Sequence, residues 1–172
     1  IKNDSLGKVT LKAKVKGKGL DPKTAQAELD GIVQKAVFNK YTYRNLTLKG
    51  NIKNGLFDVK SGMKDPNLTF NLAANGNAKD KYPLVKLKLN LDIADLQKLN
   101  LHAGPMKLRG NVDADIANTN PDLLNGEIFL SNVQILQEAE PIVLDSIKIL
   151  AFANNEQNNI KISSQFLKAE VD

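Results

Sequence analysis

The sequence contains no cysteine and no tryptophan, a single histidine, and only 5 % aromatic residues. Without cysteine the chain forms no disulfide and no thiolate metal site. His102 lacks the partners that a metal centre or a catalytic triad requires, so we expect a histidine in a surface loop. With so few aromatic rings, any interior must be built from Leu, Ile, Val and Ala, which favours an open or ligand-filled interior.

Long apolar runs and arginine are also scarce. No stretch approaches the ~18 consecutive apolar residues of a transmembrane helix. The net charge of +5 comes mostly from lysine, because Arg44 and Arg109 are the two arginines of the sequence. Surfaces that bind nucleic acid usually carry arginine with interleaved aromatic residues. We therefore expect the lysines to lie on a solvated strand face and expect no nucleic-acid partner.

The sequence is rich in strict alternation of apolar and polar residues. The apolar members of three such runs are Val9, Leu11, Ala13 and Val15; Leu68, Phe70 and Leu72; and Val85, Leu87, Leu89, Leu91 and Ile93. A period of two places all of them on one face of a strand, with lysine and other polar residues on the opposite face. The pattern predicts an antiparallel sheet with one dry face, which either fills a core or holds a ligand.

Turn-forming residues interrupt the alternation. Asn54-Gly55 is the strongest hairpin signal, since both residue types tolerate positive φ. Asp65-Pro66-Asn67, Asn75-Gly76 and the asparagines from Asn154 to Asn159 predict further turns. These breaks divide the chain into about ten strands.

The segment that follows Asp21-Pro22 is open to two interpretations. An aspartate N-cap, a proline at the first helical position and helical spacing from Ala25 to Val37 favour an amphipathic helix. The corresponding place in the second half, after Asn120-Pro121, carries glycine and β-favouring residues and so favours a strand. We expect a single helical turn near Asp21 to Thr24, followed by a strand.

Three segments recur in the same order about 100 residues later. The matching segments are Gly7–Lys12 with Gly104–Arg109, Asp21-Pro22 with Asn120-Pro121, and Tyr43–Leu48 with Leu144–Ile149. Between the two copies, Ile93 to Leu101 shifts to a period near 3.6 and predicts a helical turn that separates two units. We expect a first β repeat unit at 1–102 and a second, truncated unit at 103–172, in a fragment of a longer protein.

The order and spacing of these segments carry a family resemblance over essentially the whole chain. The segments that carry it are Gly19–Thr24, Tyr41–Leu48, Asn54-Gly55-Leu56-Phe57, Asp65-Pro66-Asn67-Leu68 and Ala94–Leu101. In this order they resemble the repeating region of the TamB family, the translocation and assembly module subunit, within the AsmA-like superfamily. The Lys- and Asn-rich composition is similar to that of family members from the Bacteroidetes.

The resemblance implies a place in the cell and a task. Family members are long periplasmic proteins, anchored in the inner membrane by an amino-terminal helix, whose β-taco-like sheet forms an open trough with an apolar inner face. Some work with an outer-membrane barrel protein. The family is tied to phospholipid transport between the inner and outer membranes and to outer-membrane protein assembly. We expect the anchor and the barrel-contacting end to lie outside this fragment.

For this chain we therefore expect an all-β fold, an antiparallel repeated sheet curled into an open trough with short helical turns between units. Phospholipid acyl chains would be held by apolar contacts alone, without cofactor, metal or catalytic residue. The predicted groove lining is Val9, Leu11, Leu46, Leu48, Leu68, Phe70, Leu72, Leu87, Leu89, Leu91, Leu108 and Ile147.

An alternative function is a structural or chaperone-like spacer in outer-membrane protein assembly. In that case two sheets would close into a dry sandwich, and the open edge strands would bind partners by β-augmentation. Exposed edges also lead us to expect edge-to-edge self-association of the fragment. No feature supports an enzyme: Asp113 and Asp115 share one strand face, but alternate with Val112 and Ala114, which indicates a solvated face.

Overall fold

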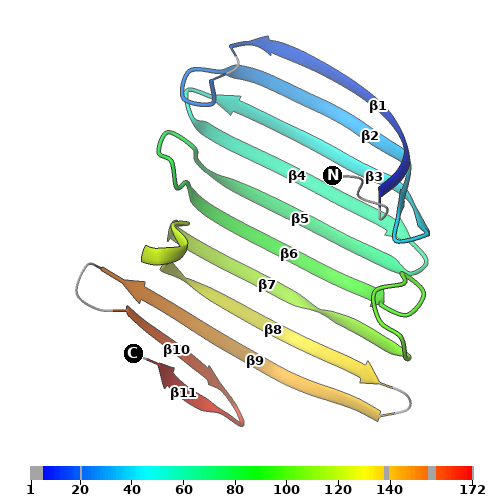
Figure 1. The fold of residues 1–172 in the computed structure, drawn as a ribbon, viewed down its shortest axis with the longest axis vertical. Coiled ribbons are helices and arrows are strands. Elements are labelled where there is room, and N and C mark those ends of the chain that lie inside the picture. The colour runs from blue at the N-terminus through cyan, green and yellow to red at the C-terminus, as the bar shows by residue number, and fades with distance from the viewer. Residues whose placement is uncertain (1–5, 20, 138–139, 155–157, 172) are drawn as a thin grey trace.

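The computed structural model describes residues 6–19, 21–137, 140–154 and 158–171, and within them all strands form a single sheet (Figure 1). The strands are β1 (Leu6–Lys18), β2 (Gln26–Phe38), β3 (Tyr41–Lys53), β4 (Leu56–Asp65), β5 (Leu68–Asn77), β6 (Leu84–Asp95), β7 (Met106–Asn118), β8 (Asn125–Gln137), β9 (Glu140–Ala153), β10 (Asn158–Ser164) and β11 (Lys168–Val171). Each strand pairs antiparallel with its neighbours in sequence, so the order in the sheet runs from β1 to β11. The prediction of an all-β antiparallel fold is confirmed.

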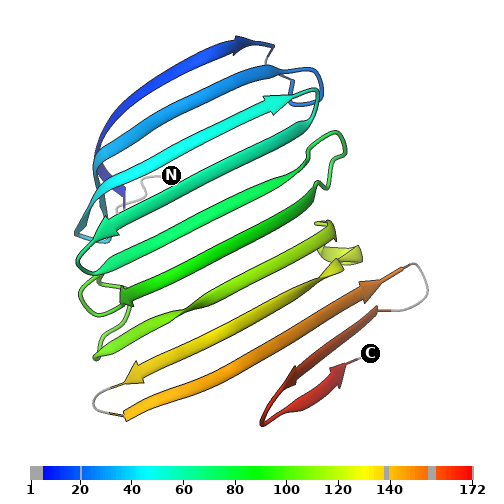
Figure 2. The same cartoon turned by 180° about the vertical axis from the view of Figure 1, so that it is seen from behind.

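The sheet is open, because β1 and β11 lie at its opposite ends and do not meet (Figure 2). It is neither closed nor strongly curled, so the expected curl into a trough is not seen. Strong curl requires bulges or glycine kinks on most strands. Register shifts occur in only four of the ten strand pairings. The alternative of two sheets packed into a sandwich is wrong for the described residues, since they form one layer.

Two of the four predicted turns are confirmed. Asn54-Gly55 joins β3 to β4 with φ angles of 51° and 85°, and Asp65-Pro66-Asn67 joins β4 to β5. Asn75-Gly76 is not a turn, because both residues lie inside β5 and pair with β4. The alternation continues through them, and the chain turns only after Asn77. Residues 155–157, within the predicted asparagine turn, lie outside the described residues.

The segment after Asp21 forms a turn and then a strand, as expected. The Ala25 amide donates to the Asp21 carbonyl over 2.7 Å, and β2 follows directly at Gln26. Because β2 lies between β1 and β3, its backbone groups are paired on both sides. Pairing with β1 and β3 thus outweighs the local helical spacing of the apolar residues. A strand whose two faces are both half-buried also tolerates apolar residues at that spacing.

A single capped helical turn follows β6, where a helical turn was expected. Asp95 is its N-cap, since the Lys98 amide donates to Asp95 Oδ1 over 3.1 Å. Asn100 ends it with a φ of 59°. The amides of Asn100 and Leu101 then donate to the carbonyls of Gln97 and Leu96 over 3.0 and 2.8 Å, which is a Schellman motif. After β7, at the place that corresponds to Asp21-Pro22 in the predicted repeat, the chain forms the 3₁₀ turn η1 (Pro121–Leu123).

The two predicted repeat units lie in one continuous sheet. β6 and β7 flank the predicted boundary at residue 102 and pair with each other from Val85↔Ile116 to Asp95↔Lys107. The ladder therefore crosses the boundary without a gap. The division into two repeat units stays a prediction.

Within the part of the chain that the structure describes, the single layer encloses no core. Among the described residues, the buried apolar side chains are Ala25, Met63, Ala94, Leu99 and Ala114. A compact monomer of this mass exposes about 8,300 Å², whereas this protein exposes 11813 Å². Most apolar side chains are therefore only half-buried against their neighbours in the sheet.

Candidate functional site

The apolar side chains are aligned from strand to strand across the sheet. Directly paired residues share a face, so the register defines rows that run perpendicular to the strands. One central row holds Ala13, Gly31, Leu48, Ser61, Leu72, Leu89, Val112, Leu130, Ile147 and Ser164. The next holds Val15, Leu29, Gly50, Val59, Ala74, Leu87, Ala114, Ile128, Ile149, Ile162 and Ala169.

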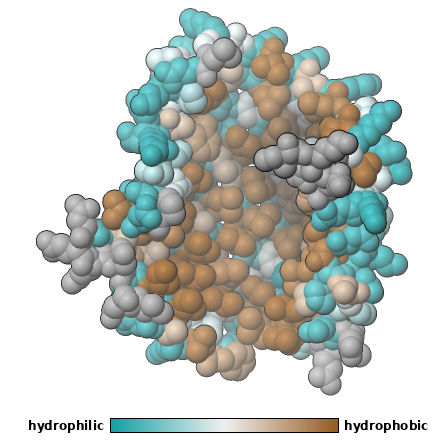
Figure 3. Space-filling model, viewed as in Figure 1, coloured by the Kyte–Doolittle hydropathy of each residue, from teal (hydrophilic) through white to brown (hydrophobic). Residues whose placement is uncertain are grey.

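These rows form a continuous apolar band, which is the candidate site (Figure 3). The band follows the direction in which the strands are stacked, and hydrophilic residues border it on both sides (Figure 3). Strands lie about 4.8 Å apart, so ten strand-to-strand steps give a band about 48 Å long. A half-bilayer of hydrocarbon is about 15 Å thick, and the band is therefore longer than one acyl chain.

The structure places eleven of the twelve predicted lining residues on this face. Leu48, Leu72, Leu89 and Ile147 share the first row, and Leu87 lies in the second. Six others extend the band along their strands, through the pairs Leu11↔Val33 and Val33↔Leu46, Phe70↔Leu91, and Leu68↔Ala94 and Ala94↔Leu108. Val9 lies beyond the register shift between Thr10 and Leu11 and pairs with Ala36, so the register does not connect it to the band. Val9 and Leu11, near the β1 edge, are 48 % and 56 % exposed.

Several members of the band were absent from the prediction. They include Val33, Phe57, Val112, Ile128, Leu130 and Ile149. Val112 alternates with polar residues, so the period-two pattern could have identified it. Each of the others has one apolar neighbour in the sequence, which interrupts the alternation. Their strands carry glycines or additional apolar residues on the other face, which weakens the alternation.

A polar cluster borders the band at one end of β3 and β4. The Tyr41 hydroxyl donates to Asp65 Oδ1, and that same oxygen accepts from the Asn67 amide over 3.0 Å. Asn67 Nδ2 in turn donates to the Tyr41 hydroxyl over 3.1 Å. Asp65 is only 6 % exposed. Burial, followed by the hydrogen bond to Asp65, raises the pKa of Tyr41, and burial with the Asp65 charge raises the pKa of Tyr43.

The turn from Asp95 to Asn100 closes the same border. The Asp95 amide donates to the Asn67 carbonyl over 2.8 Å, next to the β4–β5 turn. Asn100 Nδ2 donates to the Asn39 carbonyl over 2.9 Å, in the β2–β3 hairpin. Between these anchors, Leu99 is the most buried large side chain described, at 1 % exposure. The turn thus fixes one lateral boundary of the band.

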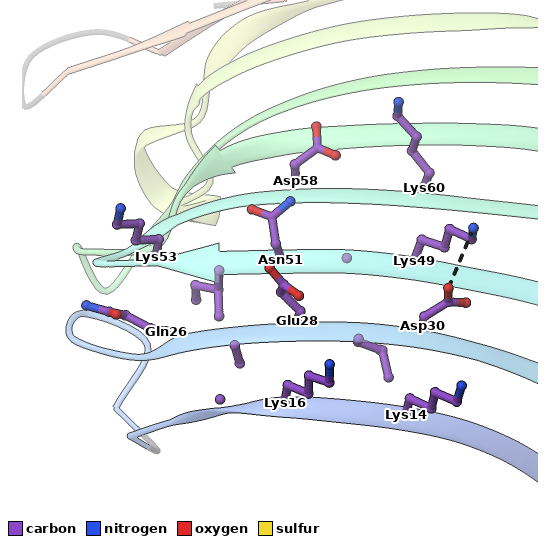
Figure 4. Close-up of a pocket in the computed structure, with 15 residues that line it drawn as sticks. Lys14, Lys16, Gln26, Glu28, Asp30, Lys49, Asn51, Lys53, Asp58 and Lys60 are labelled. Atoms are coloured by element: carbon purple, nitrogen blue, oxygen red, sulfur yellow. Dashed lines mark ion pairs between the residues drawn. The ribbon is translucent and has the colours of Figure 1, made fainter.

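The opposite face of the sheet is charged and hydrated. In Figure 4, side chains of β1 to β4 rise from this face, with lysines next to carboxylates. Lys49 pairs with Asp30 over 3.6 Å. Further along the sheet, Lys88 pairs with Asp113 over 3.1 Å. The cross-strand pairs explain how one face carries so many charges, although each exposed pair contributes little stability.

The minor candidates do not form a catalytic or metal site in the described part of the chain. Asp113 and Asp115 are each paired with a lysine and lie on the hydrated face. His102 lies exposed in a loop, where its Nδ1 contacts the Gly104 backbone. Among the described residues, no three His, Cys, Asp or Glu side chains gather as a metal site, and no helix is long and apolar enough to span a membrane.

Comparisons with known proteins provide no relative. No family model, no curated protein and no solved structure matches the chain.

Proposed function

We propose that this chain is a segment of a periplasm-spanning envelope protein whose apolar band carries phospholipid acyl chains between the inner and outer membranes. The observation that supports this most is the continuous band itself, about 48 Å long and without a second layer over it in the described residues. No chemistry is required of such a surface, so we propose a carrier and not an enzyme.

The physical gain is the removal of methylene groups from water. Burying one methylene is worth about 0.8 kcal/mol, so a bare acyl chain in an aqueous gap costs on the order of 10 kcal/mol. The rows repeat similar side chains from strand to strand. An acyl chain can therefore shift from one strand to the next without leaving a deep energy minimum.

The hydrophilic residues that border the band provide a polar environment for the phospholipid headgroups. Acyl chains would lie on the band, and headgroups would extend beyond the ends of the strands, where Figure 3 has hydrophilic residues. In the full-length protein we propose that further strands deepen this open sheet into a trough. The family resemblance adds an inner-membrane anchor and an outer-membrane barrel partner to the proposal, together with a role in outer-membrane biogenesis and protein secretion.

The first test is native mass spectrometry of the purified protein, with organic extraction of any lipid that co-purifies. We expect phospholipid at a defined ratio, and we expect Leu89→Asp to abolish it, because a carboxylate in the central row would be desolvated by an acyl chain. Asn90→Asp is the matched control, since Asn90 follows Leu89 directly in β6 and its side chain lies on the hydrated face. It should retain lipid.

Circular dichroism must show that both variants keep the β-sheet. A lipid-free wild-type protein, or equal lipid loading of Leu89→Asp and Asn90→Asp, would contradict the proposal. Unfolding of Leu89→Asp alone would indicate that the band is covered by protein in solution, which favours a spacer.

The unpaired edges favour a second candidate function, a structural or chaperone-like spacer that binds partners by β-augmentation. β1 has 13 residues and, among the described residues, no strand on its outer side, and Val15 on it is 68 % exposed. Such an edge is a template for another strand. Sedimentation velocity tests it: a Lys14→Pro variant, which changes β1 on the face opposite to the band, should lose any self-association or partner binding while still binding lipid.

A further inference from the structure

The edge strand β1 is uncovered in the described part of the chain. No strand lies on its outer side there, and residues 7–18 are all exposed. On the side of the apolar band, Leu11 is 56 % exposed and Val15 is 68 % exposed. An uncovered edge of 13 residues presents a row of unpaired backbone N–H and C=O groups, which is a template for one more strand.

The charged side chains of β1 are all of one sign. The strand carries five lysines and no acidic residue. Lys12, Lys14 and Lys16 alternate with apolar residues of the band and therefore lie on the hydrated face, where Figure 4 labels the last two. Asp30 is directly opposite Lys14, but its ion pair is with Lys49 on β3, at 3.6 Å. An excess of positive charge thus remains next to the open side of β1.

The interior of the sheet shows which residues match such a row on a neighbouring strand. Three directly paired lysines and carboxylates form ion pairs, Lys86–Asp115 at 2.6 Å, Lys88–Asp113 at 3.1 Å and Lys161–Glu170 at 2.8 Å. On the other face of β6 and β7, apolar residues oppose each other, as in Leu87↔Ala114. Opposite charges directly across a ladder stabilise it. A strand that continues this pattern beyond β1 carries Asp or Glu opposite the lysines and apolar residues opposite Leu11 and Val15.

A second copy of the chain does not match this edge. In an antiparallel β1–β1 pair, registers that align the apolar faces set lysines opposite lysines, for example Lys12 opposite Lys16. Like charges directly opposite each other destabilise a ladder, and edge lysines prevent edge-to-edge association for this reason. The other edge strand, β11, has four described residues against 13 in β1, so it would cover less than a third of β1.

We propose that β1 binds an extended acidic segment of a partner protein, in which Asp or Glu alternates with apolar residues. The segment adds one strand to the sheet, with its carboxylates on Lys12, Lys14 and Lys16 and its apolar side chains beside Val15. This inference rests on the second candidate function, edge pairing, and names its partner; it does not depend on lipid binding. Because exposed charges are screened by salt, binding should weaken as ionic strength rises.

The test uses three nine-residue peptides that differ only at alternate positions. Glu, Ser or Lys alternates with Val, and each peptide carries an amino-terminal fluorescein. Fluorescence anisotropy with the purified protein measures their affinities. We expect a micromolar dissociation constant for the Glu peptide, at least tenfold weaker binding of the Ser peptide and no binding of the Lys peptide. Amide hydrogen exchange in β1 should slow when the Glu peptide binds, because N–H groups on the outer side enter a ladder.

Two matched variants separate strand pairing from overall charge. Lys14→Gln with Lys16→Gln removes two lysines from the edge and should weaken binding of the Glu peptide at least tenfold. Lys53→Gln with Lys60→Gln removes the same charge from β3 and β4, which have strands on both sides, and should change the affinity less than twofold. Circular dichroism and lipid loading of both variants should match those of the wild type, since the four side chains lie on the hydrated face.

Other results would overturn the proposal. Equal affinity for the Glu and Ser peptides would leave edge pairing intact and refute selection by charge, whereas no binding of either peptide would refute edge pairing as well. Equal losses in both double variants, or binding without slower exchange in β1, would make the contact a nonspecific attraction. A dimer that Lys14→Pro dissolves would make a second copy the occupant. Binding of phosphatidylglycerol vesicles that displaces the Glu peptide, and that Lys14→Gln with Lys16→Gln abolishes, would make a membrane surface the occupant.

Discussion

Gly126 lies where β7 and β8 approach too closely for a side chain. A Cβ atom there would lie 2.6 Å from the Asp115 carbonyl oxygen and 2.8 Å from Ile116 Cα. Backbone atoms cannot move aside as the end of a flexible side chain can. We therefore expect Gly126→Ala to lower the free energy of unfolding by about 1–3 kcal/mol. Urea denaturation followed by circular dichroism measures the change. Gly104→Ala is the control, since its Cβ would meet only the His102 ring, at 3.7 Å; equal midpoints for both variants would refute the crowding.

Because of the tyrosines next to Asp65, the stability of the protein depends on pH in the alkaline range. The pKa values of Tyr41 and Tyr43 are raised above 10.0 in the folded state. Below pH 10.0 both states hold these protons, so the contribution is fully present. Above it the unfolded state releases protons first, and we expect stability to fall as pH rises towards the folded pKa values. Urea midpoints between pH 9 and pH 11 test this.

The double variant Tyr41→Phe with Tyr43→Phe is the control for that pH dependence. Phenylalanine cannot titrate, so its urea midpoint should depend less on pH over the same range than that of the wild type. A slope equal to that of the wild type would assign the alkaline loss to other groups.

At the scale of elements, the turn from Asp95 to Asn100 depends on Leu99. Leu99 is 1 % exposed, whereas Leu101 in the following loop is 48 % exposed. Removing a buried leucine side chain leaves a cavity, so we expect Leu99→Ala to cost about 2–4 kcal/mol. Leu101→Ala should cost less than about 1 kcal/mol. Thermal unfolding of the two variants measures the difference, and a smaller effect for Leu99→Ala than for Leu101→Ala would show that the turn does not anchor the border.

The local sequence predicted which segments form strands, and it predicted the ends of those strands less well. Alternation identified β1, β5 and β6, and Asn54-Gly55 identified the β3–β4 hairpin. Asn75-Gly76 misled because a paired strand tolerates both residues where a ladder continues on each side. The β2 segment has helical spacing, and its prediction as a strand required comparison with the second half of the sequence. In the structure, pairing with β1 and β3 accounts for the strand.

The candidate site was predictable in its chemistry and only partly in its extent. Alternation placed Leu72 and Leu89 on one dry face, and the register now makes them neighbours. It missed Ile128, Leu130 and Ile149, because β8 and β9 are apolar on both faces and a continuous apolar run has no period of two. The local sequence also did not predict how weakly the sheet curls. Curl depends on bulges that form between strands, such as the one beside Asn132.

At the scale of the whole molecule, each described strand is hydrogen-bonded to its neighbours in sequence. Stability in such arrays is a sum of local terms, and the ends open first. We expect amide hydrogen exchange to be slowest in β4 to β7 and fastest in β1, β10 and β11. Exchange mass spectrometry on peptic fragments tests this gradient. Uniform protection from β1 to β11 would instead indicate a single cooperative unit and an additional layer in solution.

The meander order also determines how the protein responds to tension. Because β1 and β11 form opposite edges of the sheet, a force applied to the two termini pulls along the direction of the ladder hydrogen bonds. Strands are then peeled from an edge one after another, instead of being sheared apart together. Under load the sheet should therefore lengthen in small steps, each releasing one strand, and re-form in the reverse order when the load is removed. An envelope protein built this way would yield to a change in the distance between two membranes without losing its central strands.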